Sequence, residues 1–145
     1  MTRTVLCAVD INRPEEEASV LRIAKQMADL DAAQLDLITV VPDFGSSIVG
    51  AYFQDHHVAT AKDGAEKALG AFAEKVLGKE ANDRVRHVVA VGKVYEEVLK
   101  TARLSGANLI VLGAHSPDLK DYLLGPNAAR IVRHSTCSVY VVRNT

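Results

Sequence analysis

The sequence has few aromatic residues, few cysteines and almost no net charge, and each scarcity argues against a class of protein. Aromatic residues make up 5% of the 145 residues and tryptophan is absent, which disfavours a platform for stacking nucleic-acid bases. The formal net charge is -1, so no basic surface field is available to hold a polyphosphate backbone. Cys7 and Cys137 both lie in apolar runs, far apart in the sequence. We therefore expect buried, unreactive thiols rather than a disulfide or a metal site.

Long hydrophobic runs are also missing. No stretch approaches the roughly 18 apolar residues that a membrane span needs. The apolar run in the opening segment MTRTVLCAVD is too short for a signal peptide and ends at Asp10. We therefore expect a cytoplasmic protein that has neither a membrane nor a nucleic acid as partner. The length and the 48% hydrophobic content suit a single globular domain over residues 1–145.

Apolar runs rich in β-branched residues predict five strands, at residues 4–10, 34–41, 84–91, 108–113 and 137–142. Helical spacing of apolar residues predicts helices at 14–30, 61–77, 94–104 and 127–134. Strands that alternate with helices predict an α/β fold, in which a five-stranded parallel sheet lies between two helical layers. We infer the strand order 3-2-1-4-5 from the common doubly wound pattern, which makes the fold Rossmann-like.

Residues 42–57, PDFGSSIVGAYFQDHH, show no clear period and contain a proline, two glycines and a serine pair. A connection of this length inside a small domain is typical of a functional lid or a mobile segment. We therefore expect a long loop at this place.

The predicted strand order places a binding crevice between the first and fourth strands. Ligands of open α/β sheets bind beyond the carboxyl ends of the strands, where the strand order reverses. The first strand ends in Asp10 and the fourth in Gly113, so these residues converge on one place. Asp10 either caps a turn or accepts hydrogen bonds from a ribose or contacts a metal ion.

A second glycine, Gly125, directly precedes a predicted helix. The start of a helix offers unpaired N–H groups and a partial positive charge, which suit a phosphate. Asn127 would cap this helix or donate a hydrogen bond to the phosphate. The spacing of Gly113 and Gly125 matches neither the dinucleotide fingerprint nor the Walker loop, and glycines are equally typical of plain turns.

The segment LGAHSPDLKDYLLGPNAARIVRHSTCSVYVVR, residues 112–143, closely resembles the carboxyl-terminal half of the universal stress protein family. It is most similar to the F/G-type branch. The segment TVLCAVD resembles the opening strand of the same family, so the resemblance covers essentially the whole chain. It implies an adenine-nucleotide site built on the motif G-x(2)-G-x(9)-G-[S/T]. Some members of the family bind ATP, and others lack the motif and do not.

The chain departs from that motif at three points. Gly113 matches the first glycine, Ser116 stands in place of the second, and Gly125 matches the third after a spacer that is one residue shorter. Pro126 replaces the serine or threonine that follows, and proline offers neither a hydroxyl nor an N–H to a phosphate. Two later amides stay available, those of Asn127 and Ala128.

The same resemblance places the adenosine at the ends of the first two strands. Ala8, Val9 and Asp10 would lie on one side of it, and Val40 would bind the adenine through its backbone. His115 either donates a hydrogen bond to a phosphate oxygen or is a solvated loop residue. His56 and His57 lack the spaced partners of a zinc site, and we predict no metal ligand among the side chains.

Three functions remain open at this point. The leading hypothesis is a regulatory protein that binds ATP or a related adenine nucleotide, with or without Mg²⁺, and has no rapid turnover. No catalytic triad or pair of carboxylates is present, so we assign no catalytic residue. The alternatives are a slow ATPase that uses Asp10, a magnesium ion and His115, and an interaction module that binds no nucleotide.

The last strand, 137–142, is an edge strand in the predicted order. It is apolar and contains no proline or charge that would block pairing with another chain. We therefore expect a homodimer through this strand, with higher oligomers open. The alternative is that the loop at 42–57 covers the edge.

Overall fold

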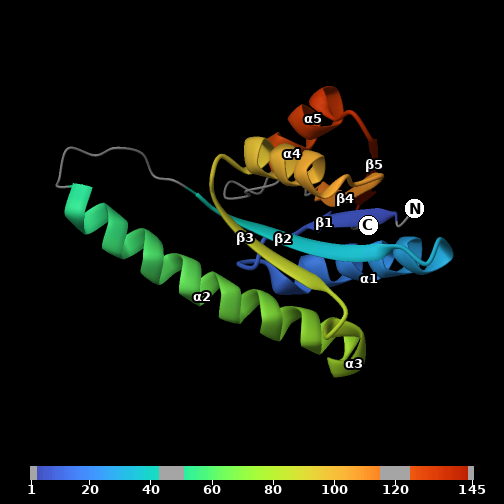
Figure 1. The fold of residues 1–145 in the computed structure, drawn as a ribbon, viewed down its shortest axis with the longest axis horizontal. Helices are drawn as coiled ribbons and strands as arrows, with labels where there is room; N and C mark the ends of the chain where they lie inside the picture. Colours follow the sequence, from blue (N-terminus) through green and yellow to red (C-terminus); the bar gives the residue numbers. More distant parts are fainter. Residues whose placement is uncertain (1–2, 43–50, 115–124, 144–145) are drawn as a thin grey trace.

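A computed structural model describes residues 3–42, 51–114 and 125–143 of the chain (Figure 1). In chain order the elements are β1 (Thr4–Ala8), α1 (Pro14–Leu30), β2 (Gln34–Pro42), α2 (Ala51–Leu77), α3 (Lys79–Asn82), β3 (Arg86–Gly92), α4 (Val94–Ser105), β4 (Leu109–Ala114), α5 (Gly125–His134) and β5 (Ser138–Arg143).

The five strands form one parallel sheet in the order β3-β2-β1-β4-β5, which confirms the predicted topology. All five residues of β1 are buried, because this strand lies at the centre of the sheet and is covered on both faces. The register pairs Ala8 with Ile38 on one side and with Leu112 on the other. The carboxyl ends of β1, β2 and β4 therefore meet at one edge.

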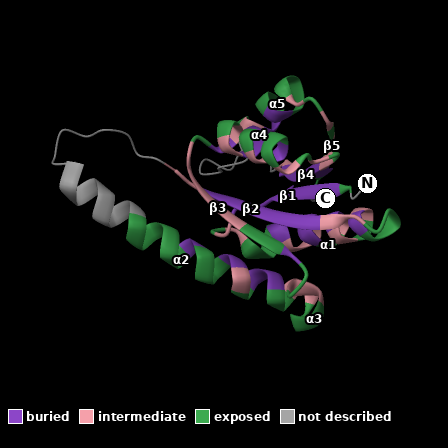
Figure 2. Cartoon of the chain, in the orientation of Figure 1, coloured by how far each residue is buried: buried purple, intermediate pink, exposed green. Residues whose placement is uncertain are grey.

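Two helical layers cover the sheet (Figure 1). Alternate side chains of a strand point to opposite faces, so neighbours in β1 belong to different cores. Cys7 packs with α1 and α2, whereas Leu6 packs with α4 and α5. Figure 2 shows the buried residues concentrated in the central strands and on the helix surfaces that face them. The fold is thus the predicted three-layer sandwich.

Local sequence explains where helix α1 begins and where helix α4 ends. Pro14 is the first residue of α1, a position whose missing N–H costs nothing, and three glutamates follow in the first turn. Helix α4 ends at Ser105, and the following residue, Gly106, adopts a left-handed backbone with φ of 66°. Its N–H group donates to the carbonyls of Ala102 and Arg103, which a helix end otherwise leaves without partners.

The structure corrects the prediction of a loop over residues 42–57. Helix α2 begins at Ala51, ten residues before the predicted start, so residues 51–57 are helical. The proline and both glycines of this stretch lie before Ala51, and nothing after it breaks a helix until Gly64. The short helix α3 was also not predicted, since four residues are too few for a periodic pattern.

One carboxylate is buried within the sheet. Asp36 of β2 is 1% exposed, and Arg86, its register partner on β3, places a guanidinium nitrogen 3.6 Å from a carboxylate oxygen. Burial raises the pKa of the Asp36 carboxyl above its ordinary value, and the positive charge of Arg86 opposes this shift. Neither carboxylate oxygen has a hydrogen-bond partner among the described residues.

Candidate functional site

The ends of β1 and β4 lie side by side, as the sequence predicts. Their register pairs Ala8 with Leu112, so Val9 and Asp10 on one strand and Gly113 on the other follow directly. Gly113 is buried and pairs with Val142 of β5. This edge is the topological switch point at which doubly wound folds bind their ligands.

Asp10 organises the turn between β1 and α1. Its carboxylate oxygen Oδ1 accepts a hydrogen bond from the N–H of Asn12 at 2.9 Å, and its carbonyl accepts from the N–H of Arg13 at 3.0 Å. The residue is 2% exposed. The carboxylate therefore has the turn-capping role that the sequence allowed, at the edge where the adenosine was expected.

Glu17 supports the same turn, although no feature of the sequence distinguishes it from the acidic residues before it. Its Oε1 accepts a hydrogen bond from the backbone N–H of Asp10 at 3.0 Å, and the side chain is fully buried. Burial raises the pKa of the neighbouring Cys7 thiol well above its ordinary value, and the negative charge of Glu17 adds to the shift. Cys7 is therefore a protonated, unreactive thiol, as expected.

Val40 directs its backbone toward the end of β1. The carbonyl of Ile38 accepts a hydrogen bond from the N–H of Val9 at 3.0 Å, so Ile38 turns its peptide groups toward β1. Residues two apart in a strand turn these groups to the same side, and β1 has ended by the level of Val40. The side chain of Val40 is buried in the core. A contact with a ligand would therefore be made through the backbone, as the resemblance implies.

Arg13 brings a positive charge to this edge, a feature that the sequence does not predict. Its Nε donates to Glu16 at 2.6 Å, and this bond raises the pKa of the guanidinium. Its Nη1 is buried and has no hydrogen-bond partner among the residues that the structure describes. The side chain lines a hollow of about 340 Å³ together with Asn12, Pro14, Glu15 and Glu16. Nothing in the sequence distinguishes this arginine from an ordinary solvated arginine at the start of a helix.

The first turn of α5 holds four of the predicted residues. The helix begins at Gly125, Pro126 is exposed, and Ala128 is buried against the core beneath α4 and α5. Asn127 is half-buried, and its Oδ1 accepts a hydrogen bond from the N–H of Tyr95 at 3.2 Å. Asn127 therefore caps the neighbouring helix α4, an arrangement that the sequence did not predict.

Two predicted residues, His115 and Ser116, lie outside the described residues. Within the described part, no three His, Cys, Asp or Glu side chains gather as they would around a metal ion. No helix among the described residues has both the length and the apolar character to cross a membrane. The cytoplasmic location stays a prediction.

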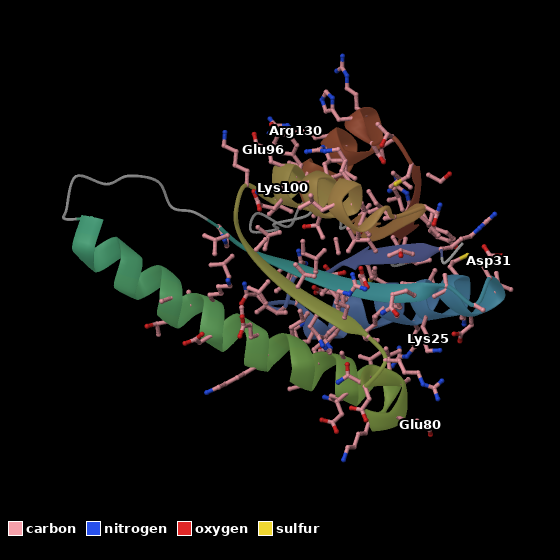
Figure 3. All side chains as sticks on the ribbon, in the orientation of Figure 1. Lys25, Asp31, Glu80, Glu96, Lys100 and Arg130 are labelled. Atoms are coloured by element: carbon pink, nitrogen blue, oxygen red, sulfur yellow. The ribbon has the colours of Figure 1, made fainter. Side chains whose placement is uncertain are left out.

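A further cavity of about 740 Å³ lies at the opposite edge of the sheet, where α1 and α3 end. Figure 3 shows Lys25 and Glu80 at this end of the molecule. The charged side chains here are paired, Lys25 with Asp29 at 2.6 Å and Arg84 with Glu80 at 3.8 Å. Because the charges neutralise one another, this cavity does not rival the edge at β1 and β4 as a candidate site.

Comparison with known proteins places the chain in a family. The model of the universal stress protein family matches residues 1–143. Universal stress protein G of Escherichia coli O157:H7 is 27% identical over 149 residues, which cover 99% of this chain and 100% of that protein. The match thus extends over both proteins from end to end.

Solved structures share the fold. The structure of protein MJ0577 of Methanocaldococcus jannaschii has a TM-score of 0.79 at 23% identity and covers 100% of this chain and 98% of its own. A universal stress protein of Archaeoglobus fulgidus in complex with dAMP has a TM-score of 0.61 at 19% identity, with 96% of each chain covered. A universal stress protein in complex with cAMP has a TM-score of 0.59 at 17% identity, with 99% of this chain and 98% of its own covered. On the match of the family model, this chain belongs to the universal stress protein family.

Proposed function

We propose that this protein binds an adenine nucleotide, ATP in the first instance, at the edge where β1 and β4 end. The observation that carries the proposal is the adjacency of these two ends, with the start of α5 only 11 residues after Ala114. Two solved relatives of the same fold hold adenine nucleotides, dAMP in one and cAMP in the other. The switch point of a doubly wound sheet is the usual place for such a ligand.

The two ends of the nucleotide would meet different chemistry. Adenosine would lie against Ala8, Val9 and Asp10, and the backbone of Val40 would bind its base. The phosphates would lie toward Gly113 and the first turn of α5, with the amides of Asn127 and Ala128 as donors. His115 and Ser116 are proposed contributors from the intervening segment. A magnesium ion would neutralise part of the charge of the phosphates.

The role would be regulatory, with binding rather than turnover as the signal. Turnover requires a positioned base or nucleophile, and the sequence has no constellation of that kind. We propose in addition that the chain forms a homodimer through β5, because this strand is apolar and ends the sheet among the described residues.

Calorimetric titration with ATP, ADP, AMP, cyclic AMP and adenosine tests the proposal. We expect saturable binding of at least one nucleotide with one site per chain, and release of less than one phosphate per site during the titration. Native mass spectrometry of the purified protein would detect nucleotide carried through purification. A chain that binds none of the five ligands would be the interaction module without nucleotide, and repeated phosphate release would identify a slow ATPase.

Replacement of Gly125 by valine tests the location of the site. A branched side chain at the first residue of α5 would stand where the phosphates must approach the helix start. We expect Gly125→Val to lose ATP binding while it keeps the far-ultraviolet circular dichroism of the wild type. A folded Gly125→Val variant with unchanged ATP affinity would show that the phosphates do not bind at the start of α5.

A further inference from the structure

Two helices on the same face of the sheet begin next to each other, and one side chain joins their first turns. Helix α4 begins at Val94, and its N-cap residue Lys93 makes no side-chain hydrogen bond to the helix. The amide of Tyr95 is one of the four at a helix start that have no partner within the helix. The Oδ1 of Asn127, 32 residues later in α5, accepts its hydrogen bond at 3.2 Å.

A second contact joins the same pair of elements. The guanidinium carbon of Arg130 lies 5.1 Å from the centre of the Tyr95 ring. Asn127 and Arg130 are three residues apart, so they lie on one face of α5. Figure 3 labels Arg130 on α5 and Glu96 and Lys100 on the neighbouring helix α4. Both contacts meet on Tyr95, one through its backbone and the other through its ring.

The buried apolar contacts of α5 do not by themselves fix the tilt of this helix. Ala128 and Ile131 pack into the apolar core beneath α4 and α5. Apolar contacts are not directional, so they hold the helix down but permit small tilts. A hydrogen bond at the first turn is directional, and it acts at the end of α5 whose amides would meet the phosphates.

We propose that Asn127 is a positioning residue of the nucleotide site, which fixes the first turn of α5 against α4 and so aims the opening amides of α5 at the phosphates. The inference rests on the proposed nucleotide binding. Its consequence is a link between the ligand and α4. Because coupling between two equilibria is reciprocal, binding of phosphates at α5 strengthens the bond between Asn127 and Tyr95.

The test combines two measurements on Asn127→Ala: calorimetric affinities for ATP and for adenosine, and hydrogen exchange of the Tyr95 amide followed by NMR. We expect ATP affinity to fall by roughly fivefold or more, as loss of one hydrogen bond implies, and adenosine affinity to stay unchanged. The Tyr95 amide should exchange faster. Asn127→Asp keeps an acceptor at the same place and should retain the protection of this amide. In the wild type, ATP but not adenosine should slow exchange at Tyr95.

Asn108→Ala is a matched control for a general loss of stability. The Oδ1 of Asn108 accepts a hydrogen bond from the backbone N–H of Thr4 at 3.0 Å, at the opposite edge of the sheet. This variant also loses one bond from an asparagine side chain to a backbone amide, but its ATP affinity should not change.

Three results would overturn the inference. A fall in ATP affinity with unchanged protection of Tyr95 would make Asn127 a direct phosphate ligand. Faster exchange at Tyr95 with unchanged ATP affinity would show that the bond plays no part in binding. A wild-type chain that binds no ATP would overturn the proposed function and this inference with it, and the wild-type titration alone reveals that case.

Discussion

Pro126 fits the start of α5, and at the proposed nucleotide site it would limit the contacts made to a phosphate. It is the second residue of α5, where the backbone N–H has no partner within the helix, so proline is tolerated. For the binding of a phosphate at the helix start, a proline at this position has a larger effect than it has on the fold. The family motif has a serine or threonine here, and proline removes both the hydroxyl and the N–H.

We expect Pro126→Ser to tighten ATP binding by roughly 1 to 2 kcal/mol, because one or two charge-assisted hydrogen bonds become available. Adenosine affinity should change little. Calorimetry with both ligands measures the two effects. Pro126→Ala restores the N–H without the hydroxyl, so it should give part of the gain. An equal gain for ATP and adenosine would contradict this account.

Asp36 links stability to pH. Burial raises its pKa in the folded state, so the folded chain holds this proton more tightly than the unfolded chain does. Its contribution to the free energy of unfolding is therefore fully present below the unfolded pKa and is lost as pH rises through the folded pKa. In the Asp36→Asn variant, the side chain at this position has no ionisable group. We expect wild type to gain stability relative to Asp36→Asn as pH falls from 7 towards about 4.

Denaturant unfolding of both proteins across this pH range provides the measurement. Asp31→Asn is a suitable control, since the exposed Asp31 pairs with Arg3 at the surface at 3.3 Å. A difference between wild type and Asp36→Asn that does not vary with pH would show that burial does not perturb this carboxyl.

At the scale of the element, Ile131 is the largest side chain that α5 buries in the core among the described residues. Ile131 is fully buried, whereas its neighbour Val132 is 51% exposed. We expect Ile131→Ala to lower the free energy of unfolding by about 2 to 5 kcal/mol, from lost burial and the cavity that remains. Val132→Ala should change it by less than about 0.5 kcal/mol. Urea unfolding of the two variants makes the comparison, and similar losses would contradict the assigned orientation of α5.

The elements could largely be predicted from the sequence because their signals are local. Strands β1 and β2 are rich in apolar residues on both faces, as strands covered on both faces require, and the helices carry apolar stripes. The predicted beginning of α2 is wrong, because the glycines before Ala51 favour a loop and hide the start of the helix.

The site was less predictable, since its geometry depends on packing between distant segments. Glu17 lies in a run of acidic residues typical of a helix start, and only its burial distinguishes it. The bond from Asn127 to Tyr95 spans 32 residues and exists because α5 packs against α4. The resemblance to a family predicts Gly113 and Gly125 as site residues, but it could not reveal that Asn127 caps another helix.

For the whole molecule, β5 is the open edge beside β4, and the proposed dimer would use it. The side chains of Val139 and Val141 pack against the core on the face of α4 and α5, whereas Tyr140 is 38% exposed. Tyr140→Lys therefore tests the interface with less damage to the fold than a change at Val141.

We expect Tyr140→Lys to shift the protein from dimer towards monomer, because two like charges would meet near the axis of a symmetric pair. Sedimentation over a range of concentrations measures the shift. Leu30→Lys, at the end of α1, replaces another exposed apolar residue, and it should leave the dimer intact. Wild-type protein that sediments as a monomer at high concentration would end the proposal.

Helix α2 packs unevenly along its length, and this has a consequence for local opening. Residues 59–64 are all exposed, whereas Leu69, Phe72 and Ala73 are buried against the core (Figure 2). A helical segment without buried apolar contacts has little to resist unwinding. Amides near residue 64 should therefore exchange with deuterated water through local fraying. Their exchange rates should depend on helix propensity alone. Amides around Leu69 and Ala73 should exchange only when the whole domain unfolds, so a single helix would report both a local opening and the global unfolding of the domain.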